Sequence, residues 1–271
     1  MAEISVTTPR GVALSGTLDA AEAGAGTSAD PADDRSETAP ARAVLFAHGF
    51  LADRTSRGRT DGLAKAYRSA GYATLAFDFG GHGDSGDDVV EVSHEVEDLE
   101  AASAHLAAAG YGHQVVHAHS MGALVALRAG SPHVRAMVLT GAVSGPVEHP
   151  WEEVLSPAKM AELTSTGRTT VLDDGPSGRE ELEISEQTLA DFTEVDQAEL
   201  LGTVACPVLM LHGGALVGGE EHPLLTQARI GLPLLPEGSR LEVLSGGEHA
   251  LLDRTEEVAA RALTWLGELG S

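Results

Sequence analysis

Apolar and polar positions change their spacing repeatedly along the chain, and each change predicts a different element. Near the N-terminus, residues 4–7 and 12–18 have the pattern of two strands, with a turn at Pro9, Arg10 and Gly11. Short apolar runs typical of buried strands follow at residues 42–47, 72–77, 114–118, 135–139, 206–211 and 240–244. Apolar residues at helical spacing predict helices at residues 61–70, 92–109, 121–129 and 256–269. Strands that alternate with helices favour a mainly parallel α/β sheet.

Two segments interrupt this alternation. Residues 19–40 consist mostly of Ala, Gly, Ser, Thr, Asp and Glu, so we expect a mobile acidic loop there. Residues 146–202 begin with prolines and a tryptophan and continue through turn-rich and acidic stretches. We interpret this segment as an insertion over the strand ends, a cap or lid. The expected organisation is a core of residues 1–145 and 203–271 with a cap of residues 146–202.

Ser120 stands where a buried strand meets a helix, and this makes it a candidate nucleophile. A serine on such a turn is held in a strained backbone conformation that lifts its hydroxyl clear of the sheet, while the next N–H points at the same spot. The strand and the helix nearly touch there, so small residues are needed two positions before and two positions after the serine. Ala118 and Gly122 meet that need, although the usual pattern has glycine at both places.

Charge and composition narrow the range of partners. The 271 residues include 41 acidic and 17 basic side chains, a formal net charge of −24, so the protein's field repels nucleic acid and anionic membranes. Cys206 is the only cysteine, which excludes an internal disulfide. Residues 1–10 lack the pattern of a signal peptide, and no run of about 18 apolar residues occurs. We therefore expect a soluble cytoplasmic protein.

Four motifs, in this order, resemble the α/β-hydrolase superfamily in its esterase, lipase and serine aminopeptidase branch, with feruloyl-type esterases among the nearest. The motifs are His48-Gly49-Phe50, the glycine-rich turn from Asp78 to Gly86, the Ser120 turn, and Gly246-Gly247-Glu248-His249. The resemblance covers residues 40–145 and 203–271. It implies the α/β-hydrolase fold, a mostly parallel sheet of about eight strands flanked by helices, with a cap insertion.

The resemblance also implies roles for particular residues. In this family a serine attacks the carbonyl carbon and a histidine after the last strand accepts its proton, which assigns these roles to Ser120 and His249. Two backbone N–H groups stabilise the oxyanion of the tetrahedral intermediate. They would be the N–H of Phe50, after the first motif, and that of Met121, at a helix N-terminus where the dipole favours negative charge.

The third triad member departs from the family pattern. The aspartate expected about three residues after the strand that ends in His-Gly is replaced by Leu216, which cannot orient an imidazole. Three explanations stay open. The acid has moved to Glu220 or Glu221, of which we choose Glu221; it comes from the preceding strand end or the cap, for example Glu148; or the chain has none.

The sequence thus predicts a serine hydrolase that cleaves a small or medium uncharged carboxylic ester, or a related acyl compound, through an acyl-enzyme. The alternative is a hydrolase fold with an incomplete triad, reused for cyclase, lyase or acyl-transfer chemistry or for ligand binding. No cofactor is implied. The aspartates around His82 could suggest a metal, but glycine- and aspartate-rich turns of this kind are structural in this fold, so we expect no metal site.

Overall fold

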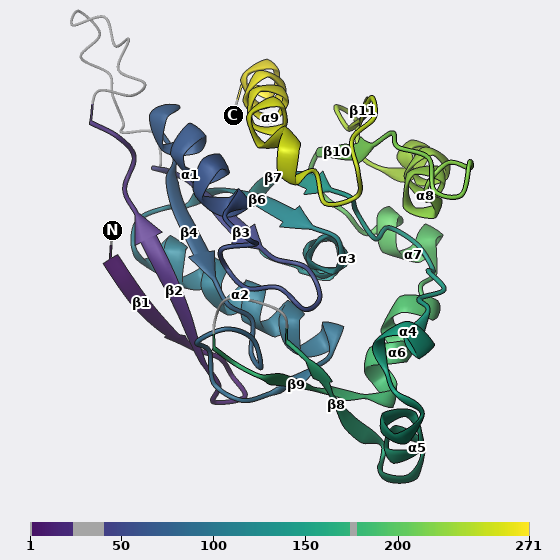
Figure 1. The fold of residues 1–271 in the computed structure, drawn as a ribbon. Helices are drawn as coiled ribbons and strands as arrows, with labels where there is room; N and C mark the ends of the chain where they lie inside the picture. The colour runs from purple at the N-terminus through teal and green to yellow at the C-terminus, as the bar shows by residue number, and fades with distance from the viewer. Residues whose placement is uncertain (1, 24–40, 174–177, 271) are drawn as a thin grey trace, which may run out of the picture.

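An eight-stranded sheet forms the centre of the protein, which is represented here by a computed structural model that describes residues 2–23, 41–173 and 178–270 (Figure 1). In chain order its strands are β1 (Ala2–Thr7), β2 (Ala13–Asp19), β3 (Arg42–Ala47), β4 (Ala73–Phe77), β6 (His113–His119), β7 (Val134–Thr140), β10 (Val208–Gly213) and β11 (Arg240–Leu244). Their spatial order is β1-β2-β4-β3-β6-β7-β10-β11. β1 pairs antiparallel with β2, and β2 with β4, while all pairs from β4 to β11 are parallel. The predicted mostly parallel α/β sheet is confirmed.

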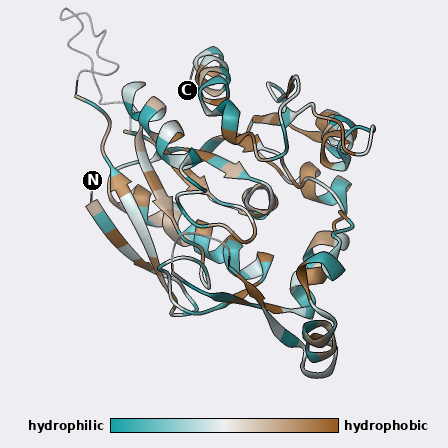
Figure 2. Cartoon of the chain, in the orientation of Figure 1, coloured by the Kyte–Doolittle hydropathy of each residue, from teal (hydrophilic) through white to brown (hydrophobic). Residues whose placement is uncertain are grey.

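Helices cover both faces of this sheet. The helices α1 (Arg59–Ser69) and α9 (Thr255–Leu269) pack on one face, and α2 (Val92–Ala108) and α3 (Met121–Arg128) on the other. Successive side chains of β3 alternate between these layers: Val44 packs with α1 and α9, and Leu45 with α2 and α3. Because both faces are buried, the central strands consist mostly of apolar residues, with a few buried polar side chains such as Thr74, Gln114 and His117 among them (Figure 2).

The predicted cap segment, residues 146–202, folds into short helices and a pair of strands. They are α4 (Trp151–Val154), α5 (Pro157–Thr166), β8 (Arg168–Leu172), β9 (Glu181–Ser185), α6 (Glu186–Thr193) and α7 (Gln197–Gly202). β9 pairs with β8 and also with β5 (Val89–Val90), which precedes α2, so a second sheet ties the segment to the rest of the chain. The pattern of the sequence did not predict this sheet. The division into core and cap stays a prediction.

One helix and one predicted loop complete the comparison between the sequence-based prediction and the structure. The sequence pattern did not predict the helix α8 (Pro223–Gly231), although Leu224, Leu225 and Ala228 are buried on one of its faces. The predicted acidic loop at residues 19–40 lies mostly outside the described residues. Within residues 2–23, 41–173 and 178–270, no helix combines the length and the apolar character needed to cross a bilayer.

Candidate active site

Ser120 sits on a sharp turn between β6 and α3. Its backbone has φ 53° and ψ −117°, a conformation that costs a non-glycine residue about 1–3 kcal/mol. The turn is held by the Ser120 N–H, which donates to the carbonyl oxygen of Thr140 at 3.0 Å. A Cβ on Gly122 would overlap the carbonyl oxygen of His48, so only glycine lets α3 approach the end of β3 this closely. The strained serine that the sequence predicts is present.

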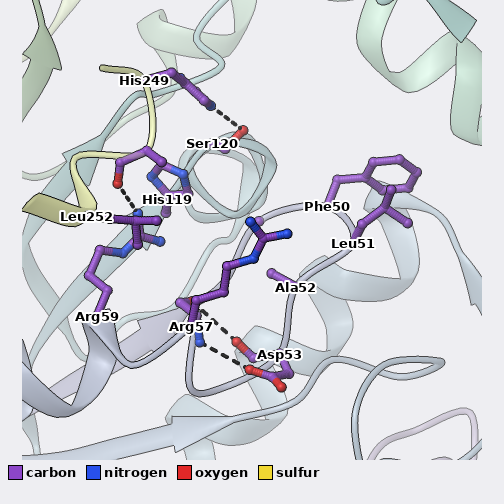
Figure 3. A pocket seen from close by; sticks show the side chains of 13 residues that line it. Phe50, Leu51, Ala52, Asp53, Arg57, Arg59, His119, Ser120, His249 and Leu252 are labelled. Atoms are coloured by element: carbon purple, nitrogen blue, oxygen red, sulfur yellow. Dashed lines mark hydrogen bonds between the residues drawn. The ribbon is translucent and has the colours of Figure 1, made fainter. Parts of the chain in front are cut away.

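His249 reaches Ser120 from the loop after β11. Its Nε2 lies 3.3 Å from the Ser120 Oγ, although the two residues are 129 positions apart in sequence (Figure 3). The left-handed Gly246, at φ 68°, turns the chain back towards the nucleophile. The backbone of Gly141 packs against His249 Nδ1, the second ring nitrogen: a Cβ added to Gly141 would lie only 2.8 Å from that atom.

No carboxylate contacts His249 in the part of the chain that the structure describes. The Glu221 side chain accepts hydrogen bonds from Arg229 Nε at 3.2 Å and from Thr226 Oγ1 at 3.1 Å, both on α8. The preceding loop is not free to extend, since Val217 and Glu220 bond to each other across a tight turn. The structure therefore does not bring the Glu221 carboxylate to His249. The prediction that Glu221 orients the imidazole gains no support from this geometry.

The other two candidate acids and the position expected for an aspartate are all at the surface. Glu220 and Glu148 are exposed and make no hydrogen bond with His249 within the described ranges. Leu216 is 66% exposed, so its side chain neither orients the imidazole nor fills a core. Of the three explanations that the sequence left open, the absence of an orienting acid agrees best with these positions.

The imidazole rings of His222 and His119 pack against the ring of His249. The ring of His222 stacks on it with centroids 5.3 Å apart and planes inclined by 10°, and the ring of His119 lies at 5.1 Å and 40°. His222 is also the N-cap of α8, since its Nδ1 accepts from the Leu224 N–H at 3.2 Å. Burial, then the nearby His222 and Arg59, lower the pKa of His249 to about 4. At neutral pH its ring is uncharged and able to accept a proton.

The two predicted oxyanion donors flank the serine. Met121 begins α3, and Phe50 follows Gly49, whose added Cβ would lie 3.2 Å from the Cβ of Ser120. Within the described residues, neither the Phe50 N–H nor the Met121 N–H has a hydrogen-bond partner. Both groups are therefore available to an oxygen atom near Ser120.

His48 fixes the loop that carries Phe50. It is 3% exposed, its Nε2 accepts from the Phe79 N–H at 3.1 Å, and its Nδ1 donates to the carbonyl oxygen of Gly49 at 2.9 Å. These two bonds set the tautomer of the ring and tie the loop to the end of β4. Burial lowers the pKa of His48, so it stays neutral in this role.

The aspartate-rich turn at residues 78–86 is built around Arg54. Asp78 accepts from the Arg54 N–H and the Asp84 N–H, and its carboxylate pairs with the Arg54 guanidinium at 2.6 Å. His82 lies beneath the turn with no exposed surface. Within the described residues there is no group of three His, Cys, Asp or Glu side chains that could hold a metal ion.

A cavity of about 210 Å³ opens in front of Ser120. The loop at residues 49–59 and the loop at residues 249–252 form its walls, and Phe50 and Arg59 lie on opposite sides of it (Figure 3). Sequence reasoning did not single out Arg59 or His222. Each lies at the start of a helix and belongs to no motif, so only the fold brings them to the serine.

Comparisons with known proteins agree with this architecture. The esterase domain of a Rhodothermus marinus protein is 22% identical, with a TM-score of 0.63 over 98% of this chain and 97% of that one. The α/β hydrolase GrgF from Penicillium sp. sh18 is 16% identical, with a TM-score of 0.73 over 98% of both chains. A thermophilic esterase from Thermogutta terrifontis is 17% identical, with a TM-score of 0.64 over 100% of both chains. At these identities the likeness establishes the fold.

The family assignment comes from the sequence itself. No curated protein matches the chain significantly. Residues 38–174, slightly more than half of the chain, match the family model described as serine aminopeptidase, S33. This stretch contains the His48 motif, the glycine-rich turn and the Ser120 elbow. The chain therefore belongs to the serine aminopeptidase S33 family of the α/β-hydrolase superfamily.

Proposed function

We propose that this hydrolase cleaves a carboxylic ester, or a related acyl compound, through an acyl-enzyme on Ser120. The observation that carries the proposal is the 3.3 Å separation between Ser120 Oγ and His249 Nε2 at the edge of a cavity. A serine hydroxyl needs a base within hydrogen-bond reach to act as a nucleophile at neutral pH. The esterases among the solved structures of similar fold support the same reaction class.

The reaction runs in two halves. Ser120 Oγ attacks the carbonyl carbon while its proton moves to His249 Nε2, and the carbonyl oxygen becomes an oxyanion between the Phe50 and Met121 N–H groups. The bond to the alcohol then breaks, and the alcohol leaves with the proton from His249. Water, deprotonated by His249, attacks the acyl-enzyme in the second half, releasing the acid and restoring Ser120.

Because the Ser120–His249 pair has no orienting acid among the described residues, we expect a low kcat. In serine triads, loss of the proper acid partner lowers kcat by about 10⁴, because the histidine adopts the wrong tautomer and its charged form is not stabilised. Here the surroundings of His249 act in the same direction, since burial, then His222 and Arg59, lower its pKa to about 4 and make it a weak base. We expect slow hydrolysis of unactivated esters and faster hydrolysis of esters with good leaving groups.

The same observation supports a second function. A hydrolase fold in which no carboxylate contacts the histidine, within the described residues, suits reactions that need an oxyanion site and a neutral imidazole more than fast hydrolysis. Acyl transfer to an alcohol or amine other than water, or an intramolecular cyclisation, would use the same acyl-enzyme. Lyase chemistry or ligand binding alone would not form it.

A fluorophosphonate probe tests the proposal. We expect it to label the wild-type protein and not Ser120→Ala, with His249→Gln labelled much more slowly. Equal labelling of wild type and Ser120→Ala would reject Ser120 as the nucleophile. Labelling of Ser120 without release of acid from nitrophenyl butyrate, but with ester formed when a small alcohol is added, would favour acyl transfer over hydrolysis.

A further inference from the structure

Arg59 is an arginine buried beside the nucleophile. It begins α1 and is only 7% exposed, yet it lines the cavity that contains Ser120 and His249. A guanidinium is rarely removed from water to this extent unless an anion balances it. We therefore expect an anionic group to bind Arg59.

That partner is not present among the described residues. The Arg59 side chain makes one hydrogen bond there, from Nη1 to the carbonyl oxygen of Ala250 at 2.6 Å (Figure 3), and no carboxylate of the described residues forms an ion pair with it. Burial without an opposing charge lowers the pKa of Arg59 to about 10, so it remains a cation at neutral pH. A guanidinium has five N–H donors in a fork, and most of those of Arg59 are unused.

The carboxylate that lines the same cavity is already engaged. Asp53 Oδ1 accepts hydrogen bonds from the Thr55 N–H at 2.8 Å, the Thr55 hydroxyl at 2.6 Å and the Ser56 N–H at 3.1 Å. These bonds close the turn that leads into α1. They leave the Asp53 side chain committed to its own loop, so it does not neutralise Arg59.

We propose that the substrate of this enzyme carries a carboxylate, which Arg59 binds while the ester carbonyl lies at Ser120. This inference rests on the proposed esterase function and replaces the uncharged substrate that the sequence suggested. The overall charge of −24 repels anions at long range, so recognition depends on the cations that line the cavity, and of these Arg59 is buried while Arg57 is exposed. Arginine suits the task because its fork matches the two oxygens of a carboxylate.

A bound carboxylate would also assist the reaction. The cation of Arg59 is one of the causes that lower the pKa of His249. A substrate anion paired with Arg59 would offset that cation and raise the pKa of His249 in the complex, which makes the histidine a stronger base. The substrate would thus bring to the site a negative charge that no side chain of the described residues provides near His249.

Matched esters test the preference. We expect the wild type to cleave 4-carboxyphenyl butyrate faster than 4-carbamoylphenyl butyrate, or the mono-phenyl ester of adipate faster than phenyl adipamate, by about tenfold or more in kcat/KM. The first pair places the carboxylate on the alcohol and the second places it on the acyl group. Each rate is divided by that of hydroxide-catalysed hydrolysis. Absence of preference in both pairs would overturn the inference.

Variants locate the preference. Arg59→Gln should reduce it to nearly one, because glutamine can still donate to the Ala250 carbonyl but carries no charge, and Arg59→Lys should retain part of it. Arg240→Gln removes one exposed cation that pairs with Glu268 and does not line the cavity, so it should leave the preference unchanged. An Arg59→Gln enzyme that still prefers the anionic esters would contradict the assignment.

A binding measurement separates this inference from the proposed chemistry. In calorimetric titrations, adipate should bind Ser120→Ala more tightly than adipamide does, and should lose that advantage in Ser120→Ala/Arg59→Gln. This result would support Arg59 as an anion site even if no ester were cleaved. Equal, weak binding of adipate and adipamide to Ser120→Ala, in a protein whose wild type is labelled by the fluorophosphonate, would reject the anion site and leave the esterase proposal standing.

Discussion

His222 stacks on His249 with ring centroids 5.3 Å apart and ring planes inclined by only 10°. A stacked ring restricts rotation of the imidazole about its own bonds, which is part of what a triad aspartate does through a hydrogen bond. It would not stabilise the imidazolium that forms in the proposed reaction when Ser120 gives up its proton. His222 is therefore a positioning residue in this site, and it supplies only one of the two effects of an acid.

Replacing His222 tests that role. His222→Asn keeps an acceptor for the N-cap of α8 but loses the stacked ring, so kcat should fall by about 2- to 12-fold, the factor that corresponds to about 0.5–1.5 kcal/mol. His222→Phe keeps the ring and loses the cap, so it should retain kcat but lower the melting temperature. If His222→Asn retained kcat while His222→Phe lost it, the N-cap of α8, and not the stacked ring, would support activity.

The pH profile reports the charge state of His249. A protonated imidazole cannot accept the serine proton, so kcat/KM should fall as pH drops through the pKa of the free enzyme, which is about 4 for His249. We expect kcat/KM for a neutral nitrophenyl ester to stay level from neutral pH down to about pH 5 and to fall below that. In Arg59→Gln the fall should move to higher pH, because one cation near His249 is gone. A wild-type midpoint near the ordinary value of about 6.5 would contradict the described environment.

The proposed oxyanion site uses backbone N–H groups and not side-chain atoms. Phe50→Pro removes one N–H donor and should lower kcat by about 10²–10³, as loss of an oxyanion donor does in other serine hydrolases. Phe50→Leu keeps that N–H and should retain most of kcat, although it loses aromatic contacts with Trp151 and Phe192. Similar kcat values for the two variants, with both folded by circular dichroism, would remove Phe50 from the oxyanion site.

The order of motifs predicted the fold and half of the site. Short apolar runs located the central strands of the main sheet because helices cover both faces of these strands, whereas the turn at Pro9, Arg10 and Gly11 helped to locate the partly exposed β1 and β2. Ser120 and His249 were found because an elbow needs small residues at fixed positions, and because the last strand delivers a loop to the same sheet edge. The structure brings these two side chains together, while their catalytic roles stay proposals.

The rest of the site depends on contacts that no spacing encodes. Glu221 was chosen because two glycines suggested a loop able to reach His249, but Gly218 and Gly219 adopt positive φ angles in a closed turn. Arg229, near the C-terminal end of the unpredicted helix α8, then pairs with Glu221. Arg59 likewise lines the same cavity as Ser120 because α1 packs beside α9, whose preceding loop carries Ala250 and His249.

The most direct test of the central claim is to trap the acyl-enzyme. Wild-type protein mixed with excess 4-nitrophenyl butyrate and quenched in acid should gain the mass of one butyryl group, located by peptide mapping on Ser120. Ser120→Ala should gain none, and His249→Gln should acylate far more slowly. Butyrylation on any other residue, or nitrophenol release by Ser120→Ala at the wild-type rate, would contradict the account.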